Sequence, residues 1–223
     1  MGENDFYQIY TKLILSTTYL FLINFSLFFI YKNYFKAYKI QDKKSLSLSH
    51  TSNIILVNFS LIAYILPSFI ALYFSIYNHN KIKIYQIRDL VCTALLDDFY
   101  FYWFHRFLHT KFMYKHIHSI HHQARAPKIL DYLYAHLFEL IFGSLGILIC
   151  VLTFNLDFTT TFIFTIFRHI HEAHIHCGYN FTFLPKIPFM TSTLNHDKHH
   201  LNVICNYSNS FIIWDLLFGT YKS

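Results

Sequence analysis

The sequence predicts an all-α integral membrane protein with about four membrane-embedded helices and a cytosolic, histidine-rich helical cap. Three observations support this fold class. Hydrophobic residues make up 54% of the 223 residues and charged residues only 13%, whereas an ordinary soluble domain has about 25% charged residues. Long apolar runs recur along the chain. Thirteen of the sixteen histidines lie in two windows, residues 105–122 and 169–200.

The composition argues against several classes of protein. The chain has five glycines and neither a GxGxxG nor a GxxxxGK motif, so a nucleotide-binding fold is not expected. Its four cysteines form no CxxC pair, which argues against a disulfide framework and a thiolate zinc site. The net charge is +6, and the basic residues flank apolar runs instead of forming one block. This pattern suits a membrane surface better than nucleic acid.

Two apolar runs near the N-terminus are long enough to cross a hydrocarbon core of about 30 Å as helices. They cover residues 13–31 and 54–77, and we expect the second to bend near Pro67. A cleaved signal peptide is the competing interpretation of the first run, but its flank is acidic and no small-residue cleavage site follows. We therefore expect a transmembrane region over residues 1–90 and a histidine-bearing domain over residues 91–223.

Two further apolar stretches complete the membrane region. Residues 89–104 lead into the first histidine window, and residues 137–167 are interrupted at 155–157, which predicts two shorter helices or a re-entrant hairpin. The lysine-rich connector after the first span favours the cytosol. Counting crossings from that connector places both histidine windows in the cytosol, in the endoplasmic reticulum membrane of a eukaryote or the cytoplasmic membrane of a bacterium.

The first histidine motif, HRFLH, places His105 and His109 four residues apart. On a helix these imidazoles lie on the same side and reach one metal ion, although an interfacial helix with the same spacing needs no metal. Asp98 and Tyr102 lie on the same stripe. We expect the Asp98 carboxylate to accept the second ring N–H of a ligand histidine and so fix its tautomer.

Two HxxHH motifs strengthen the metal interpretation. The first consists of His118, His121 and His122, and the second of His196, His199 and His200. The spacing predicts that each triplet shares one helical face. Together with HRFLH they supply eight imidazoles, more than one tetrahedral zinc needs, which indicates two nearby metal ions. Iron, zinc and copper all accept imidazole, so the spacing does not choose the element.

The segment RHIHEAHIH contributes the remaining histidines of the second window. It resembles the zinc-protease motif HExxH, but Ile175 stands where the second histidine is required, so a protease is excluded. On a helix Glu172 shares a stripe with His176, which favours His176 as a ligand supported by Glu172. We expect His171 and His174 to be surface or accessory residues, and His116 to point away from the site.

The order HRFLH, HSIHH, HCGYN and HDKHH resembles that of the fatty acid hydroxylase and sterol desaturase superfamily, most closely its methylsterol monooxygenase branch. The resemblance extends from about residue 97 to residue 220. Further residues that resemble family signatures are Tyr134, Ala135, His136 and Glu139, and then Asn206, Tyr207, Trp214, Asp215, Phe218, Gly219 and Thr220. Leu137 replaces the proline expected after His136, and Cys177 stands where this branch usually has serine.

The resemblance implies a di-iron centre, with zinc as an alternative occupant, that uses O₂ to hydroxylate or desaturate a C–H bond of a sterol or fatty-acyl lipid in lipid biosynthesis. The metal ligands it implies are His105, His109, His118, His121, His122, His176, His196, His199 and His200, with His136 as a tenth. It also implies that electrons come from NAD(P)H through a separate reductase and a small haem cytochrome.

Two other functions compete with a lipid oxygenase. One is a metal-binding or metal-transport membrane protein without catalysis, for which we expect polar ligands inside the spans. The other is a catalytically inactive scaffold, which the intact set of ligand positions disfavours.

Overall fold

The computed structural model describes residues 54–78, 82–180 and 188–223, together with isolated positions between residues 7 and 41. Helices are the regular elements within these ranges. Extended segments there pair in an isolated antiparallel bridge between Met190 and Phe211. The predicted all-α class is therefore confirmed for the described part of the chain.

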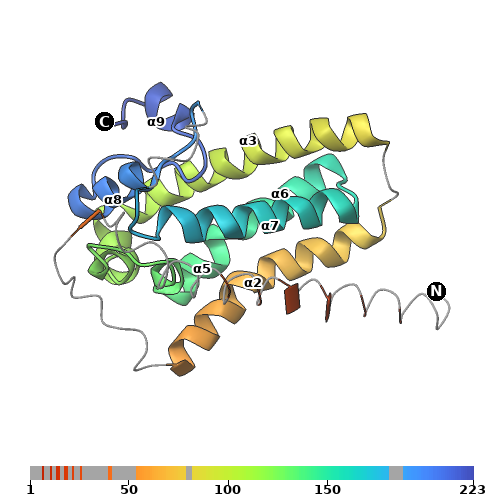
Figure 1. Cartoon of the computed structure of the whole chain (residues 1–223), viewed down its shortest axis with the longest axis horizontal. Coiled ribbons are helices and arrows are strands. Elements are labelled where there is room, and N and C mark those ends of the chain that lie inside the picture. The colour runs from red at the N-terminus through yellow and green to blue at the C-terminus, as the bar shows by residue number, and fades with distance from the viewer. Residues whose placement is uncertain are drawn as a thin grey trace.

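Four helices run side by side and form the body of the molecule (Figure 1). They are α2 (Ile54–Ile76), α3 (Lys83–Leu108), α6 (Leu145–Phe154) and α7 (Phe158–Ile175). Both α2 and α3 contact α6 and α7. The short helix α5 (Leu137–Gly143) precedes α6 and packs on α2 and α3. Helix α2 continues through Pro67, and it changes direction along its course in Figure 1.

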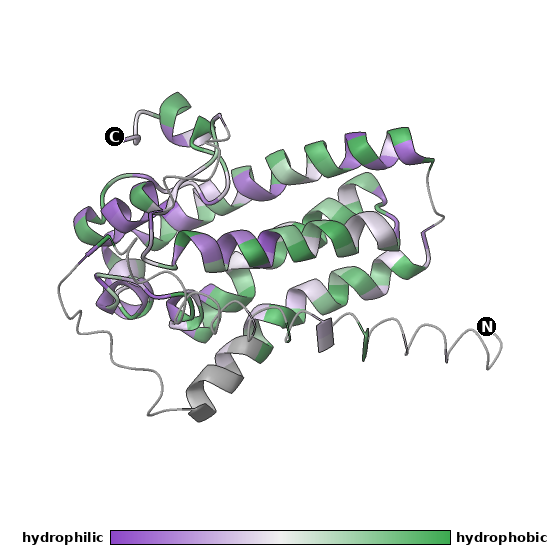
Figure 2. Cartoon of the chain, viewed as in Figure 1, coloured by the Kyte–Doolittle hydropathy of each residue, from purple (hydrophilic) through white to green (hydrophobic). Residues whose placement is uncertain are grey.

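Short elements gather at one end of these helices, where α8 lies in Figure 1, and we call this end the cap. They are α4 (Lys111–Met113), the π-helix η3 (Tyr114–His118), the 3₁₀ turns η4 (His121–Gln123) and η5 (Asp131–Leu133), α8 (Thr193–Asn202) and α9 (Ile213–Leu217). Figure 2 shows hydrophobic residues along the long helices and hydrophilic residues gathered at the cap.

The break predicted at residues 155–157 is confirmed. Asn155 ends α6 in the left-handed conformation, with φ of 51°. Asp157 then caps α7, because its carboxylate accepts the Thr160 backbone N–H at 3.0 Å. Asn78, just past α2, donates to the Leu156 carbonyl at 2.6 Å, so the turn is fixed to the neighbouring helix. The chain thus reverses between α6 and α7 at the end opposite the cap.

Within the described residues, one apolar helical stretch is long enough to cross a membrane, Leu137–Phe154, which covers α5 and α6. The apolar part of α2, Ile62–Ile76, is shorter. Most of the first predicted span, residues 13–31, lies outside the described residues. Large apolar side chains such as Ile62, Val91 and Leu152 are exposed on the helices, as expected of surfaces that face lipid. The full set of four membrane helices stays a prediction.

A buried ion pair joins α3 to α7. The Arg168 Nε lies 2.9 Å from Asp97 Oδ2, and both residues are only 2% exposed. Arg168 also donates through Nη2 to the Gly143 carbonyl at 2.7 Å. Gly146 of α6 packs directly on this pair, because a Cβ at that position would overlap the Asp97 carboxylate. Breaking a buried pair of this kind is costly, since the remaining charge is left unpaired.

We predict that Gly146→Ala destabilises the protein by about 1–3 kcal/mol, because the added methyl displaces the Asp97 carboxylate from Arg168. Gly143→Ala is the matched control, since a Cβ there meets the Phe104 ring at an ordinary 3.5 Å. Thermal unfolding of both variants in detergent measures the difference. Equal stability of the two variants would contradict the packing argument.

Candidate metal centre

Nine histidines converge in the cap as two adjacent clusters, and in each cluster the candidate ligand atoms lie within 4.8 Å of one another. The five-histidine cluster consists of His105, His109, His118, His122 and His199. The four-histidine cluster consists of His121, His176, His196 and His200. These are the nine positions that the sequence indicates. Eight of the nine are buried, and His109 is half-buried.

Each HxxHH motif is divided between the two clusters. His118 and His122 belong to the five-histidine cluster, whereas His121 lies in the other. In the second motif His199 joins the five-histidine cluster, and its neighbours join the four-histidine cluster. The motif therefore does not present one face to one metal ion. It contributes ligands to both clusters.

Local backbone structure explains the division of the first motif. The segment ending at His118 is a π-helix, and the next two histidines lie in the 3₁₀ turn η4. The expected continuous α-helical face is thus wrong for this motif, because both the π and the 3₁₀ turns rotate side chains relative to an α-helix. Such π-helical turns frequently occur at functional sites.

The second motif lies on a regular helix, α8, that begins at a capping box. The Ser192 hydroxyl accepts the Asn195 N–H, and the Asn195 side chain accepts the Ser192 N–H at 3.3 Å. The helix ends at Val203, whose φ is 55°. This short, well-defined helix holds three ligands rigidly, from His196 to His200.

In three rings of the five-histidine cluster, Nδ1 faces an acceptor. The ring of His105 bonds to the Tyr207 carbonyl at 2.7 Å, and that of His199 bonds to the Cys205 carbonyl at 2.6 Å. A carbonyl oxygen only accepts, so each Nδ1 carries the hydrogen and each Nε2 keeps its lone pair. His118 Nδ1 lies 2.9 Å from a carboxylate oxygen of Glu139.

Two rings of the four-histidine cluster also have an acceptor for Nδ1, whereas the Nδ1 atoms of His196 and His200 are buried without one among the described residues. His121 Nδ1 donates to the Tyr134 carbonyl at 3.2 Å, and His176 Nδ1 donates to the Glu172 carbonyl at 2.8 Å. Acceptors on the second ring nitrogen are typical of metal-bound histidines, because they fix the tautomer and the ring orientation.

Burial lowers the pKa of all nine imidazoles, to about 2 for His109 and about 4 for His121. Neighbouring imidazoles in the same clusters lower most of these pKa values further. The rings are therefore neutral near pH 7, which is the form that binds a metal ion.

The spacing of the ring nitrogens fits metal ions. His118 Nε2 lies 3.1 Å from His105 Nε2, 3.0 Å from His109 Nε2 and 3.0 Å from His122 Nε2. One ring nitrogen cannot satisfy three others, and facing lone pairs repel. Ligand nitrogens at about 2.0–2.1 Å from a metal ion and at right angles lie about 3 Å apart, which is the spacing found here.

The second cluster has the same geometry. His196 Nε2 lies 2.8 Å from His176 Nε2 and 3.1 Å from His200 Nε2. His121 Nε2 is 3.4 Å from His176 Nε2. Both clusters therefore fit one metal ion each through imidazole nitrogens alone. The four cysteines are free thiols and belong to neither cluster.

The two carbonyls that accept from rings of the five-histidine cluster, those of Cys205 and Tyr207, lie on one loop, residues 205–211, and buried polar side chains hold this loop. Asp215 accepts the N–H groups of Tyr207 and Ser208 at 2.8 and 2.9 Å. Asn206 bonds through its side chain to the backbone of Asn195 and Lys222. Asn206 and Asp215, two residues of the C-terminal family signature, therefore hold the loop in place.

Asp98 acts on the same loop and does not contact a ligand histidine directly, contrary to expectation. Its two carboxylate oxygens accept the backbone N–H groups of Asn209, Ser210 and Phe211 at 2.7–3.2 Å. Asp98 does lie on the same side of α3 as His105, as predicted, but its carboxylate binds the loop instead of the ring. Its link to His105 passes through the loop and the Tyr207 carbonyl.

Other predicted residues lie around the clusters. His136 belongs to neither cluster, because it is exposed and its Nδ1 caps α5 by accepting the Phe138 N–H at 3.1 Å. The Glu172 carboxylate lies 3.8 Å from His176 Nδ1, so its backbone carbonyl makes the closer contact. His116 is exposed, as expected.

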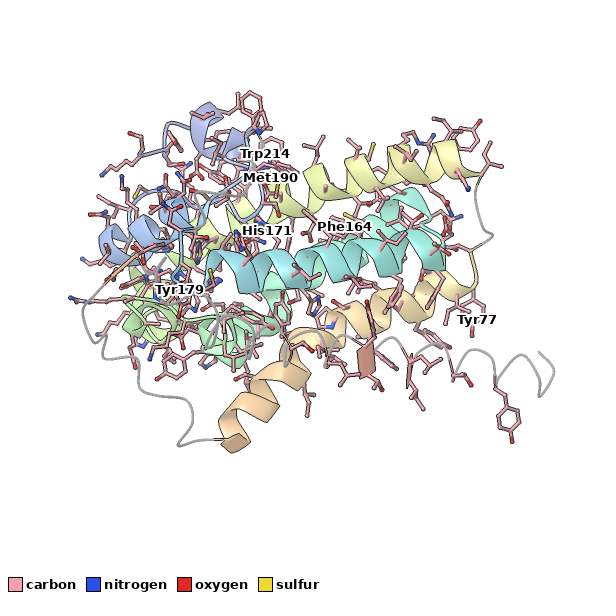
Figure 3. All side chains as sticks on the ribbon, viewed as in Figure 1. Tyr77, Phe164, His171, Tyr179, Met190 and Trp214 are labelled. Carbon is pink, nitrogen blue, oxygen red and sulfur yellow. The ribbon has the colours of Figure 1, made fainter. Side chains whose placement is uncertain are left out.

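His171 is not a surface residue, contrary to expectation. It is 5% exposed, and its Nε2 bonds to the Asn209 carbonyl at 3.0 Å. Figure 3 shows His171 on α7, nearer the cap than Phe164. The histidine spacing also did not predict that Glu139 pairs with His118. Glu139 could have been found from the family signature that includes His136, of which it is a part.

Comparison with known proteins agrees with this geometry. The family model described as fatty acid hydroxylase matches residues 90–220. A Dictyostelium discoideum protein provisionally named a methylsterol monooxygenase is 39% identical over 138 residues, which cover 61% of this chain and 51% of that protein. Methylsterol monooxygenase 1 of Rattus norvegicus is 36% identical over 135 residues, covering 60% of this chain and 46% of its own.

A rice relative carries a different name. The very-long-chain aldehyde decarbonylase GL1-11 of Oryza sativa subsp. indica is 33% identical over 141 residues, covering 61% of this chain and 53% of that protein. The chain therefore spans about half the length of these curated relatives. No solved structure matches the chain.

We predict that His199→Ala lowers the bound metal of anaerobically purified protein from about two equivalents to one or fewer, because it removes a fully buried ligand. His116→Ala is the matched control. It removes an exposed ring that packs on Phe112, so we expect unchanged metal content and stability within about 0.5 kcal/mol. Elemental analysis measures both. Full metal occupancy of the His199 variant would show that the site is misassigned.

We predict that Asp98→Asn weakens metal retention by about 10- to 100-fold, because an amide cannot accept three backbone N–H groups as the carboxylate does. Competition with a chelator measures the retention. Asp89→Asn is the control on the same helix, since Asp89 pairs with Arg88 and is not part of the loop contacts. Unchanged retention in the Asp98 variant would contradict a positioning role for the loop.

Proposed function

Because the chain belongs to the fatty acid hydroxylase family, we propose that it is a membrane-bound di-iron oxygenase that hydroxylates a C–H bond of a sterol or fatty-acyl lipid. The methylsterol monooxygenase relatives favour a sterol-like substrate. Desaturation of the same substrate class is the alternative outcome. The observation that carries the proposal is one cavity that both histidine clusters line.

The position of this cavity suits a lipid substrate. Its metal-facing wall includes His105 and His118 from one cluster and His121, His176 and His196 from the other. The remaining wall comes from α2, α3, η5, α5 and α7. It includes the aromatic and aliphatic side chains of Phe101, Tyr132 and Leu140, beside the polar side chains of Glu139, Arg168 and Glu172. A C–H bond of a substrate that enters the cavity would lie beside both histidine clusters.

Bound iron supplies the activation of O₂, which the protein side chains do not provide. Hydroxylation consumes one O₂, two electrons and two protons, places one oxygen atom in the C–H bond and releases the other as water. We propose that the electrons come from NAD(P)H through a separate reductase and a small haem cytochrome. The contribution of this chain is to hold the nine rings in their neutral form, exclude bulk water and orient the lipid.

Burial of the ligands argues against metal transport. Eight of the nine histidines are buried, and both clusters lie together at the cap instead of along a path through the helices. A transport path requires ligands at successive depths. The polar residues within the body, Asp97 and Arg168, pair with each other instead.

The test of the oxygenase proposal is expression of the chain in a sterol-producing host, followed by lipid profiling under ¹⁸O₂. We expect one labelled oxygen in a sterol or acyl product of the wild type and none with His199→Ala, because a ligand position is lost. The His116→Ala protein should match the wild type. A wild type that binds two metal ions and oxidises no lipid would overturn the proposal.

We also propose that the cap faces the cytosol, which the lysine-rich connector and the basic residues of the first histidine window support. The sequon at Asn180 should stay unmodified in a eukaryotic host. The sequon at Asn206 is uninformative, because this side chain is 3% exposed and hydrogen-bonded.

Ile82→Thr completes a sequon at Asn80, on the predicted luminal side, and should gain a glycan. A glycan on Asn180 would reverse the orientation.

A further inference from the structure

Two residues that line the cavity, Tyr64 and Arg168, each carry a buried polar atom without a hydrogen-bond partner in the described part of the chain. Tyr64 is 5% exposed and Arg168 is 2% exposed, and both line the cavity. Among the described residues, neither the Tyr64 hydroxyl nor the Arg168 Nη1 has a hydrogen-bond partner. Leaving such groups buried and unsatisfied costs free energy unless a bound group pairs with them.

Both side chains are fixed by other contacts. Arg168 is held through Nε by Asp97 and through Nη2 by the Gly143 carbonyl, so only Nη1 is left without a partner. The Tyr64 ring packs edge-on against Tyr132 and His169, with ring centroids 5.2 and 4.8 Å away. The two residues come from different helices, α2 and α7, and Arg168 is among the charged groups that act on the Tyr64 hydroxyl.

We propose that Tyr64 and Arg168 form an oxygen-binding subsite, which holds a neutral hydroxyl or carbonyl oxygen of the lipid and so places a nearby C–H bond at the metal centre. Arg168 donates to the oxygen, and the Tyr64 hydroxyl either donates to it or accepts from a substrate hydroxyl. The inference rests on the proposed oxygenase function and adds which part of the substrate is recognised.

The charges around the subsite favour a neutral oxygen over a carboxylate. Asp97 already neutralises Arg168, so the pair has no net charge to offer to an anion. Arg168 is the one Arg or Lys side chain among the described residues that line the cavity, so they offer no second cation to balance an anion. An alcohol or a carbonyl accepts the Nη1 hydrogen bond without needing a counter-charge. The subsite therefore selects lipids that carry such an oxygen and rejects those with an anionic headgroup.

The test is ligand binding to the full-length, iron-loaded protein in detergent under anaerobic conditions, so that no turnover occurs. One set of probes is cholesterol, cholest-5-ene and cholesterol sulfate, and the other is 1-hexadecanol, hexadecane and palmitate. Within each set the scaffold is constant, and the oxygen is neutral, absent or anionic. Equilibrium dialysis of radiolabelled probes gives the affinities, and the set that shows the preference distinguishes a sterol from an acyl chain.

We expect the alcohol of at least one set to bind about tenfold more tightly than its oxygen-free analogue, the size of one hydrogen bond to a charged donor. Tyr64→Phe should reduce this preference several-fold, because it removes the hydroxyl and keeps the ring packing. Tyr100→Phe is the matched control, since its hydroxyl already donates to the Phe142 carbonyl at 2.7 Å and the residue is not among those lining the cavity. It should keep the full preference.

Equal binding of alcohol and oxygen-free probes, tightest binding of the anionic probes, or an undiminished preference in Tyr64→Phe would each overturn the subsite. Arg168→Lys is a second variant that keeps a positive charge beside Asp97 but loses Nη1, and it should lose the preference at unchanged metal content. Failure of the oxygenase function would show separately, as absence of two bound metal ions or of ¹⁸O incorporation, because the binding test needs no turnover.

Discussion

An imidazole that presents the lone pair of Nε2 to a metal ion carries its hydrogen on Nδ1, and that hydrogen needs an acceptor inside a buried cap. Much of the cap follows from this requirement. The carbonyls of Cys205 and Tyr207 serve His199 and His105, and the Tyr134 carbonyl serves His121. Since backbone carbonyls are fixed only when their loop is fixed, the polar side chains that hold the loop help to orient the rings.

The body of the protein and the cap meet in helix α3. Its buried residue Asp97 forms the ion pair with Arg168 of α7, and the neighbouring Asp98 holds the loop beside the five-histidine cluster. About two turns further on, the same helix carries His105, and its C-cap residue is His109. A single helix thus connects the apolar body, the cavity wall and the ligands, so a shift of α3 moves all three together.

The sequence predicted much of this architecture because histidine spacing and apolar runs have direct physical meaning. The nine candidate ligands and the break after Asn155 follow from residue types and periods. The division of the first HxxHH motif between two clusters did not follow, because it depends on a π-helix and a 3₁₀ turn that the spacing does not reveal. The division of the second motif, on the regular helix α8, depends on where the other histidines lie in space. The backbone carbonyls that accept from the imidazoles could not be predicted from the sequence either, since every residue has a carbonyl group. Asp98 was placed on the correct side of the helix but with the wrong partner, because the loop it binds lies 112 residues away.

The contacts that hold the loop at residues 205–211 join distant parts of the chain, and this has a consequence for biosynthesis. His105 and His109 enter the growing chain early, but the acceptor of His105 lies on the loop at Tyr207, and that loop is held in turn by Asp215. Contacts between residues so far apart in the chain close late, because the ends of a long loop must first be brought together. His105 and His109 therefore lack their fixed surroundings until the C-terminal residues have been added. The five-histidine cluster is complete only after residues 199–215 have folded against α3.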